Sequence, residues 1–278
     1  MEWNSESPLR PVCPDDLGTL EFSVDSLRCR ECGREFASKS EVLEFLPKEV
    51  FVESSARGRL LNAYGKSFSD RREASWHRPF REFLNRLGNG YIYSWAARTI
   101  QEFSDRQPLS ILDAGCGEGA LRQYLSSWRP YVGIDFSTRP LLRAQRHHPG
   151  SYFRADLNQL PFLNETFDMV VSLQALQYLD RPNVALAEMA RVLKPGGTLL
   201  LSVPNDECFK YQRQGIPPIQ LQRFSRQNLS ELVEARFDIL RIDSQGFWLP
   251  LPKLAIHVAG SYPARWGLSW TMVAKLKN

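Results

Sequence analysis

The sequence has 278 residues, of which 43% are hydrophobic and 24% charged, with a formal net charge of +4. This length can hold one large α/β domain with a small additional unit, and so small a charge excess does not by itself indicate nucleic-acid binding. The chain has no apolar run near the ~18 residues that a membrane helix needs, and its first residues lack the pattern of a secretion signal. We therefore expect no integral membrane segment and a cytoplasmic location. Five cysteines, an odd number, favour thiols or metal ligands over a disulfide framework.

Residues 1–47 form a predicted zinc-ribbon-like domain. Short apolar segments surround a Cys-x-x-Cys-Gly sequence at 29–33, in which the glycine permits the turn that directs both sulfurs at one metal. A further Cys-Pro pair begins at Cys13, but the second cysteine of a C-P-x-C pattern is replaced by Asp16, a poorer zinc ligand. The candidate metal ligands are Cys13, Asp16, Cys29 and Cys32. The alternative is a metal-free ribbon held together by Phe22, Phe36 and Phe45.

Residues 48–106 form a predicted helical linker or lid. Eleven Lys or Arg against seven Asp or Glu give this segment a charge of +4. Apolar spacing predicts one helix over 80–87, ended by the sequence Gly-Asn-Gly at 88–90, and a second over 92–103. Either these helices form a lid or acceptor platform, or they pack the ribbon against the main domain with a solvated charged face. In the first case the candidate contacts are Tyr64, Tyr91, Tyr93 and Trp95.

Residues 107–278 alternate predicted strands and helices, which favours an α/β fold with a mostly parallel sheet covered by helices on both faces. The predicted strands are 109–113, 131–135, 151–155, 167–171, 198–203, 237–243 and 269–276. The predicted helices are 119–127, 139–147, 183–193 and 226–235.

A glycine-rich sequence, Asp-Ala-Gly-Cys-Gly-Glu-Gly at 113–119, follows the first of these strands, and Asp135 ends the next. In a parallel sheet, a glycine turn after one strand and an acid at the tip of its neighbour form a nucleoside-binding edge. The spacing G-x-G-x-G differs from the G-x-G-x-x-G of dinucleotide sites and from the phosphate-binding G-x-x-x-x-G-K. We therefore predict S-adenosylmethionine (SAM) as the cofactor, with Asp135 hydrogen-bonded to its ribose.

Four ordered pieces of residues 108–205 resemble the class I SAM-dependent methyltransferases, and among them the subgroup that includes ubiquinone and menaquinone methyltransferases. The pieces are 112–119, 133–137, 155–162 with its Leu-Pro-Phe, and 167–172 running on to the Lys-Pro-Gly-Gly of 194–197. The resemblance implies a Rossmann-like, seven-stranded, mostly parallel sheet.

The resemblance also implies roles for individual residues. The glycine loop, with Gly115, Cys116 and Gly117, would hold the methionine moiety, and Asp113 would orient that loop from below. Phe136 would stack on the adenine, which Asp156 and Leu157 would also contact. Ser172 and Gln174 would line the methyl-transfer face. Gln177 replaces a histidine that many relatives carry, and it stands with Tyr178 and His77 as a candidate for catalysis.

The other histidines are weaker candidates for a general base. His147 and His148 end a predicted helix and are expected at the surface. His257 lies in an apolar stretch, which favours a packed core histidine.

The amino-terminal ribbon resembles the small zinc ribbon of the tRNA-methyltransferase activator family, and a ribbon ahead of a class I domain is also the layout of ribosomal large-subunit guanine-N1 methyltransferases. Three functions stay open at this stage. The first is methylation of a small, largely apolar acceptor at oxygen or carbon, which the Pro- and Trp-rich insert at 246–252 favours. The second is RNA-base methylation, and the third is a non-catalytic partner protein.

Overall fold

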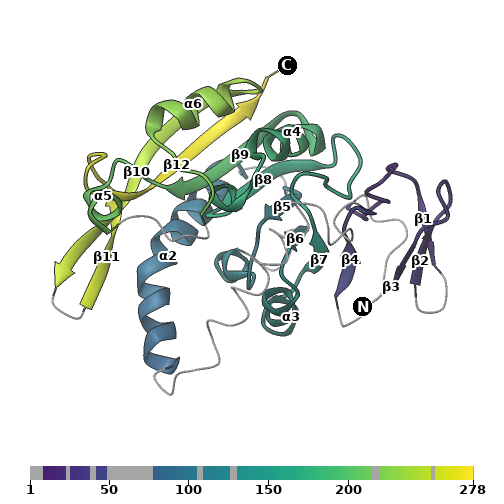
Figure 1. Ribbon diagram of the computed structural model, residues 1–278, viewed down its shortest axis with the longest axis horizontal. Helices are drawn as coiled ribbons and strands as arrows, with labels where there is room; N and C mark the ends of the chain where they lie inside the picture. Colours follow the sequence, from purple (N-terminus) through teal and green to yellow (C-terminus); the bar gives the residue numbers. More distant parts are fainter. Residues whose placement is uncertain are drawn as a thin grey trace.

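The computed structural model (Figure 1) describes residues 9–22, 26–37, 42–48, 78–104, 109–125, 130–214, 220–251 and 254–277. Side chains are described throughout these ranges except at 78–89, 214, 248–251 and 254–259.

A nine-stranded sheet runs through the molecule in the order β11-β10-β12-β9-β8-β5-β6-β7-β4. The pairings from β4 to β9 are parallel, and β12, β10 and β11 continue the sheet antiparallel. The strands are β4 (Leu43–Phe45), β5 (Ile111–Ala114), β6 (Tyr131–Asp135), β7 (Ser151–Ala155), β8 (Phe167–Leu173), β9 (Leu193–Pro204), β10 (Phe237–Leu251), β11 (Leu254–Ser261) and β12 (Gly267–Leu276). The predicted Rossmann-like α/β fold is confirmed. The sheet has two strands more than the seven predicted, because β4 and β11 extend its two edges.

Helices cover both faces of this sheet (Figure 1). Buried residues of α4 and α6 belong to the hydrophobic cluster on one face, and those of α2, α3 and η2 to the cluster on the other. Among the described helices, none has the length and apolarity to span a membrane. The helices are α2 (Arg78–Glu102), α3 (Thr138–His147), α4 (Pro182–Val192), α5 (Phe209–Gln214) and α6 (Arg226–Glu234), with 3₁₀ turns η2 (Ala120–Tyr124) and η3 (Leu176–Tyr178).

Helix α2 corrects the prediction of two helices between residues 80 and 103. It continues through the Gly-Asn-Gly sequence at 88–90 that was expected to end the first of them. Each glycine in a helix costs about 1 kcal/mol relative to alanine, but Ile92, Ala96 and Ile100 are at most 3% exposed against the sheet. Burial of one such side chain contributes roughly 1.5–3 kcal/mol, so packing outweighs the local preference.

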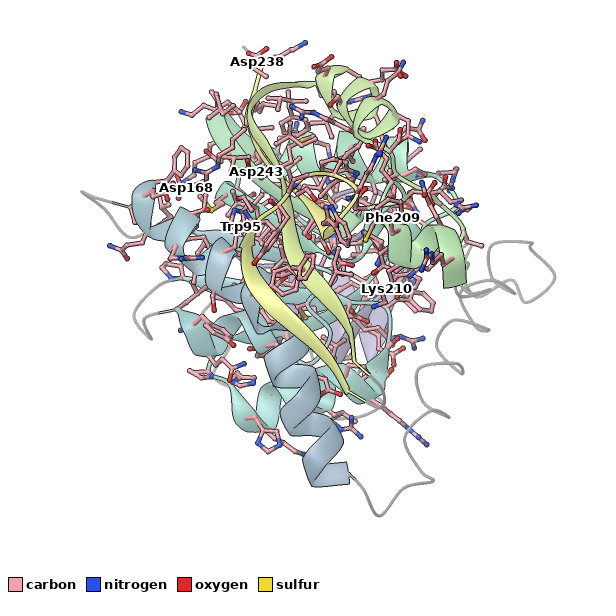
Figure 2. All side chains as sticks on the ribbon, turned by 90° about the vertical axis from the view of Figure 1, so that its left-hand side faces the viewer. Trp95, Asp168, Phe209, Lys210, Asp238 and Asp243 are labelled. Atoms are coloured by element: carbon pink, nitrogen blue, oxygen red, sulfur yellow. The ribbon has the colours of Figure 1, made fainter. Side chains whose placement is uncertain are left out.

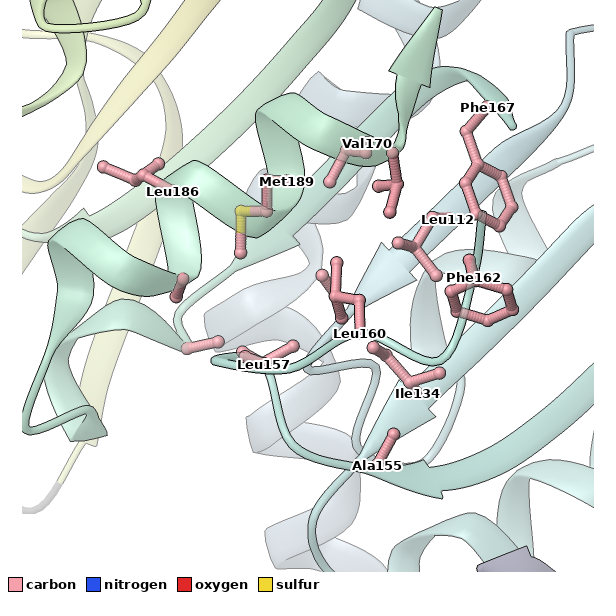
Figure 3. Close-up of a cluster of buried hydrophobic side chains, with 14 of the residues drawn as sticks. Leu112, Ile134, Ala155, Leu157, Leu160, Phe162, Phe167, Val170, Leu186 and Met189 are labelled. Carbon is pink, nitrogen blue, oxygen red and sulfur yellow. The ribbon is translucent and has the colours of Figure 1, made fainter. Parts of the chain in front are cut away.

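Alternate residues of the central strands belong to the two hydrophobic clusters that lie on opposite faces of the sheet. On β5, Ile111 belongs to one cluster and Leu112 to the other, and both are fully buried. Figure 3 shows Leu112 and Ile134 in the layer that also includes Phe162 and, on helix α4, Met189. A strand buried on both faces is apolar at nearly every position, with Asp113 the exception on β5, which is why the sequence pattern predicted these strands well.

The amino-terminal segment contributes to two sheets. Its strands β1 (Leu20–Phe22), β2 (Ser26–Cys29) and β3 (Glu35–Ala37) form a separate antiparallel sheet. Strand β4 then pairs in parallel with β7 of the central sheet, with Phe45 opposite Ala155. The end of the predicted ribbon is therefore an edge strand of the larger domain.

Candidate cofactor site and metal centre

The glycine loop lies at the carboxyl edge of the sheet, between β5 and η2. The backbone N–H groups of Gly115 and Cys116 both donate to the carbonyl of Ile134 on β6, at 2.9 Å. Gly115 has a φ of +88°, and a Cβ there would lie 2.5 Å from that of Ala175, so only glycine fits. At Gly117 the φ is +55°, and a Cβ would meet no atom of the chain within 4 Å. The loop therefore presents its backbone to open space at Gly117.

Asp135 ends β6 and is tied to this loop. Its Oδ2 accepts a hydrogen bond from the N–H of Gly117 at 3.0 Å, and its Oδ1 accepts one from the N–H of Ser137 at 2.8 Å. Burial raises the pKa of this carboxyl, and the two backbone donors oppose that effect. The acid thus holds the glycine loop and the turn after β6 in one arrangement.

Asp113 and Cys116 are buried beside this edge. Asp113 accepts a hydrogen bond from the hydroxyl of Tyr131, and burial raises the pKa of the Asp113 carboxyl to about 7. The sulfur of Cys116 lies against Gly133, where a Cβ would be 2.9 Å away. Burial raises the pKa of its thiol, so Cys116 is a packing residue held in its neutral form.

The residues predicted to contact adenine surround the tips of β6 and β7. The guanidinium carbon of Arg154 lies 5.0 Å from the centroid of the Phe136 ring, and its Nε donates to the Phe136 carbonyl at 2.8 Å. Asp156 is buried and accepts from the backbone N–H of Asn158 at 2.8 Å. The side chain of Leu157 comes within 3.9 Å of the Cβ position at Gly115. The structure therefore brings the predicted adenine residues next to the glycine loop.

The segment after β8 follows the same edge. The hydroxyl of Ser172 donates to the carbonyl of Ala114 at 2.9 Å, which joins β8 to β5. Gln174 has a φ of +58°, and its Nε2 donates to Ser202 on β9 at 2.9 Å. Gln177 donates from Nε2 to the carbonyl of Gln174 at 2.9 Å. Its Oε1 is buried and has no hydrogen-bond partner among the described residues. Such an oxygen suits a bound molecule that donates a hydrogen bond from an N–H or O–H group.

Helix α5 brings further polar groups to this region, Lys210 and Tyr211, which no sequence motif singles out. Burial raises the pKa of Tyr211 to about 12, and nearby Cys208 and Tyr178 act in the same direction. Burial lowers the pKa of Lys210. Figure 2 shows Phe209 and Lys210 on this short helix, beside the β10–β11 hairpin. A polar helix of six residues has too few turns for its periodicity to be read, so only its place after β9 could have indicated a role.

Tyr91 of helix α2 packs against the central sheet. Its hydroxyl lies 2.9 Å from the hydroxyl of Ser269 on β12, which in turn lies 3.3 Å from Nε2 of Gln174.

The histidines give no general base among the described side chains of this site. His77 lies outside the described residues, and so do the side chain of His257 and the whole of Tyr64. His147 ends α3 and is exposed, as expected.

The four predicted metal ligands lie together. The Sγ atoms of Cys13, Cys29 and Cys32 and a carboxylate oxygen of Asp16 are all within 4.8 Å of one another. The sulfurs of Cys13 and Cys32 are 3.7 Å apart, and Asp16 lies 3.4 Å from the sulfur of Cys29. All five cysteines are free thiols, and three of them belong to this cluster.

Protonation in this cluster reflects burial and local donors. Burial raises the pKa values of the Cys13 and Cys29 thiols. The backbone N–H of Gly18 donates to Asp16 at 2.8 Å and lowers the pKa of that carboxyl to about 2. The carboxylate is thus charged at neutral pH, whereas both thiols would have to lose their protons to bind a metal.

Comparison with known proteins agrees with the fold and with the glycine edge. Residues 112–201 match the family described as methyltransferase domain. The match covers about a third of the chain, and the sheet order is that of a Rossmann-like α/β fold. Solved structures share the fold, among them a SAM-dependent methyltransferase from Thermotoga maritima with a TM-score of 0.54, 19% identity and coverage of 73% of this chain and 96% of that one. A chain of a Haloferax volcanii complex between the Trm112 methyltransferase activator and a methyltransferase gives a TM-score of 0.51 at 21% identity, covering 73% of this chain and 98% of that one.

Curated relatives are similar over a shorter stretch. The malonyl-[acyl-carrier protein] O-methyltransferase of Buchnera aphidicola is 38% identical over 99 residues, which are 34% of this chain and 39% of the relative. The fatty-acid O-methyltransferase of Mycolicibacterium smegmatis is 32% identical over 123 residues, 42% of this chain and 43% of the relative. The chain spans less than half the length of each of these two relatives.

Proposed function

We propose that this protein is a SAM-dependent methyltransferase that methylates a small, largely apolar acceptor at oxygen or carbon. The observation that carries the proposal is the glycine loop held by Asp135 at the carboxyl edge of the sheet, with open space above Gly117. The names of the O-methyltransferases that match part of the chain support an acyl carboxylate as the acceptor, and therefore oxygen as the methylated atom.

In the proposed reaction the protein acts mainly by alignment. SAM supplies an activated methyl group, so the residues have to position an acceptor in line with the methyl–sulfur bond and exclude water. Asp135 holds the ribose, the backbone at Gly115 and Gly117 holds the methionine moiety, and Asp156 with Leu157 holds the adenine.

The acceptor lies, in this proposal, against the segment after β8 and helix α5. The Oε1 of Gln177 has no hydrogen-bond partner among the described residues and can accept from a hydroxyl or N–H elsewhere on the acceptor molecule, away from its carboxylate, and Tyr178 lines the same face. Lys210 supplies a half-buried positive charge that suits a carboxylate. A carboxylate acceptor is already ionised at neutral pH, so no general base is required.

We also propose that Cys13, Asp16, Cys29 and Cys32 bind zinc. Sulfur atoms bound to one tetrahedral zinc at about 2.3 Å stand about 3.8 Å apart, and the sulfurs of Cys13 and Cys32 are 3.7 Å apart. Three thiolates and one carboxylate form a closed ligand set of the structural kind. Zinc there would stabilise the small sheet and take no part in methyl transfer.

The test of the acceptor class is incubation of the protein with radiolabelled SAM and separated lipid, RNA and protein extracts. We expect label in the lipid and small-acid fraction. Label found only in RNA would contradict this acceptor and favour RNA-base methylation. Calorimetry that detected no binding of S-adenosylhomocysteine would instead contradict the proposed cofactor and favour a non-catalytic partner.

A further inference from the structure

The amino-terminal unit touches the loop that carries the predicted adenine residues. The Nε2 of Gln159 donates to the carbonyl of Pro14 at 2.6 Å, and the N–H of Val12 donates to the carbonyl of Pro161 at 2.8 Å. Gln159 is itself bridged to Asp156, whose carbonyl accepts from the Gln159 N–H at 3.0 Å. Pro14 follows the metal-ligand residue Cys13 directly. The thiol cluster is therefore linked to the loop that carries Asp156 through Pro14 and a single hydrogen bond.

A second contact links the amino-terminal unit to Phe136, another of the predicted adenine residues. Glu44 on β4 pairs with Arg154 on β7 at 3.2 Å, and their side chains are only 10% and 21% exposed. Arg154 in turn donates to the Phe136 carbonyl and lies over the Phe136 ring. Loss of one partner from such a largely buried pair leaves an uncompensated charge, so Glu44 fixes the position of Arg154. Arg154 then holds Phe136, the neighbour of Asp135.

A metal would determine how firmly the first contact is held. The segment from Cys13 to Asp16 is a short turn, and the adjoining strands β1, β2 and β3 have only three or four residues each. The hydrophobic core shared with the central sheet orders these strands, and a metal would add a cross-link at the turns that carry Cys13 and Cys32. With the ligands released, the carbonyl of Pro14 loses its fixed position, and with it the restraint on Gln159.

We propose that the amino-terminal unit is a wall of the cofactor site, and that metal binding at the cysteine cluster and SAM binding at the sheet edge strengthen each other. This inference rests on the cofactor and metal proposed above. Because linkage is reciprocal, each ligand raises the affinity for the other by the same factor. Gln159, Glu44 and Arg154 are positioning residues that transmit the effect to Asp156 and Phe136.

The first experiment measures the linkage in both directions with the full chain. Calorimetry gives the Kd of S-adenosylhomocysteine for zinc-loaded and chelator-treated protein, and we expect a Kd at least about fivefold higher without zinc. A chromophoric chelator then gives the zinc affinity with and without saturating S-adenosylhomocysteine, which should change by the same factor. Equal Kd values in both forms would overturn the linkage alone. Absence of binding in both forms would overturn the proposed function, and the linkage with it.

The second experiment keeps zinc in place and removes the contacts. Gln159→Ala and Glu44→Gln should each raise the Kd of S-adenosylhomocysteine, and Gln159→Ala should also bring the zinc linkage factor close to one. The matched control is Glu21→Gln, which breaks the exposed Glu21–Arg30 pair of the same small sheet. The control should leave the Kd unchanged. If both test variants bound S-adenosylhomocysteine with the native Kd, the amino-terminal unit would not be a wall of the cofactor site, whatever the effect of chelation.

Discussion

Asp135 combines two structural tasks at one carboxylate. Its two oxygens accept from the N–H groups of Gly117 and Ser137. A hydrogen bond to a charged group contributes about 1.5–3 kcal/mol. Loss of this side chain removes both restraints, together with the proposed contact to the ribose.

Asp135→Ala is expected to abolish methyl transfer and to weaken S-adenosylhomocysteine binding by at least about 100-fold, which corresponds to about 3 kcal/mol. Calorimetry measures the affinity, and circular dichroism checks that the variant is folded. Asp238→Ala, at an exposed position on β10 far from the edge (Figure 2), is the matched control. Undiminished affinity in Asp135→Ala would show that the ribose assignment is wrong.

Asp113 is an acid in an apolar environment, so its protonation is coupled to stability. Burial raises the pKa of this carboxyl from 3.8 to about 7. The folded state therefore binds the proton more tightly than the unfolded state does. The stability that Asp113 contributes is fully present below about pH 4 and is lost as the pH rises to about 7.

Asp113→Asn is expected to have little effect on the free energy of unfolding near pH 4 and to raise it by about 1 kcal/mol or more near pH 8, since the amide stays neutral. Urea unfolding at both pH values measures the difference. Asp238→Asn serves as the exposed control. An effect of the same size at both pH values would contradict the assignment of the raised pKa to Asp113.

At the scale of elements, the cysteine turns and strand β2 form one unit around the cluster. Cys13 and Asp16 belong to one turn, and Cys29 ends β2 just before the turn that carries Cys32. Three thiols with a carboxylate are a weaker zinc site than four thiols, because thiolate is the softer ligand.

Asp16→Cys completes the four-cysteine set and is expected to raise the zinc affinity at least about tenfold, as ligand changes of this kind commonly do. Competition with a chromophoric chelator measures the affinity. Asp238→Cys adds a thiol at a distant exposed position and should leave the affinity unchanged. An unchanged affinity in Asp16→Cys would mean that this position does not coordinate the metal.

At the scale of the whole molecule, β4 makes the amino-terminal unit and the large sheet one body. The ring of Phe45 on β4 is fully buried, 5.4 Å from that of Phe36 on β3 and 5.5 Å from that of Phe153 on β7. The same hydrophobic cluster includes residues of the small sheet and of the central strands. We therefore expect both parts to unfold together.

Phe45→Ala is expected to lower the free energy of unfolding by about 3–5 kcal/mol and to keep a single transition. Circular dichroism and tryptophan fluorescence, followed in the same urea titration, should give coincident curves. Leu240→Ala, at a side chain that is 54% exposed, should change stability by less than about 0.5 kcal/mol. Two separate transitions would show that the small sheet folds on its own.

The sequence alone was sufficient for the central fold and for the place of the glycine loop and Asp135 at the carboxyl edge of the sheet. Buried parallel strands are apolar at nearly every position, and the glycine turn and Asp135 follow directly from their places in the chain. The four metal-ligand candidates were also predictable, because their spacing is local: Cys13 with Asp16, and Cys29 with Cys32.

Only the tertiary structure decided how the segments combine. Strand β4 joins the large sheet because its edge pairs with β7, a contact between residues about 110 positions apart. Helix α2 continues through two glycines because burial of its second half outweighs their local cost. The Glu44–Arg154 pair and the Gln159–Pro14 hydrogen bond likewise leave no local pattern. The periodicity of a sequence indicates which residues within one segment are buried. These features depend instead on favourable contacts between segments that are far apart in the sequence and meet only in the folded chain.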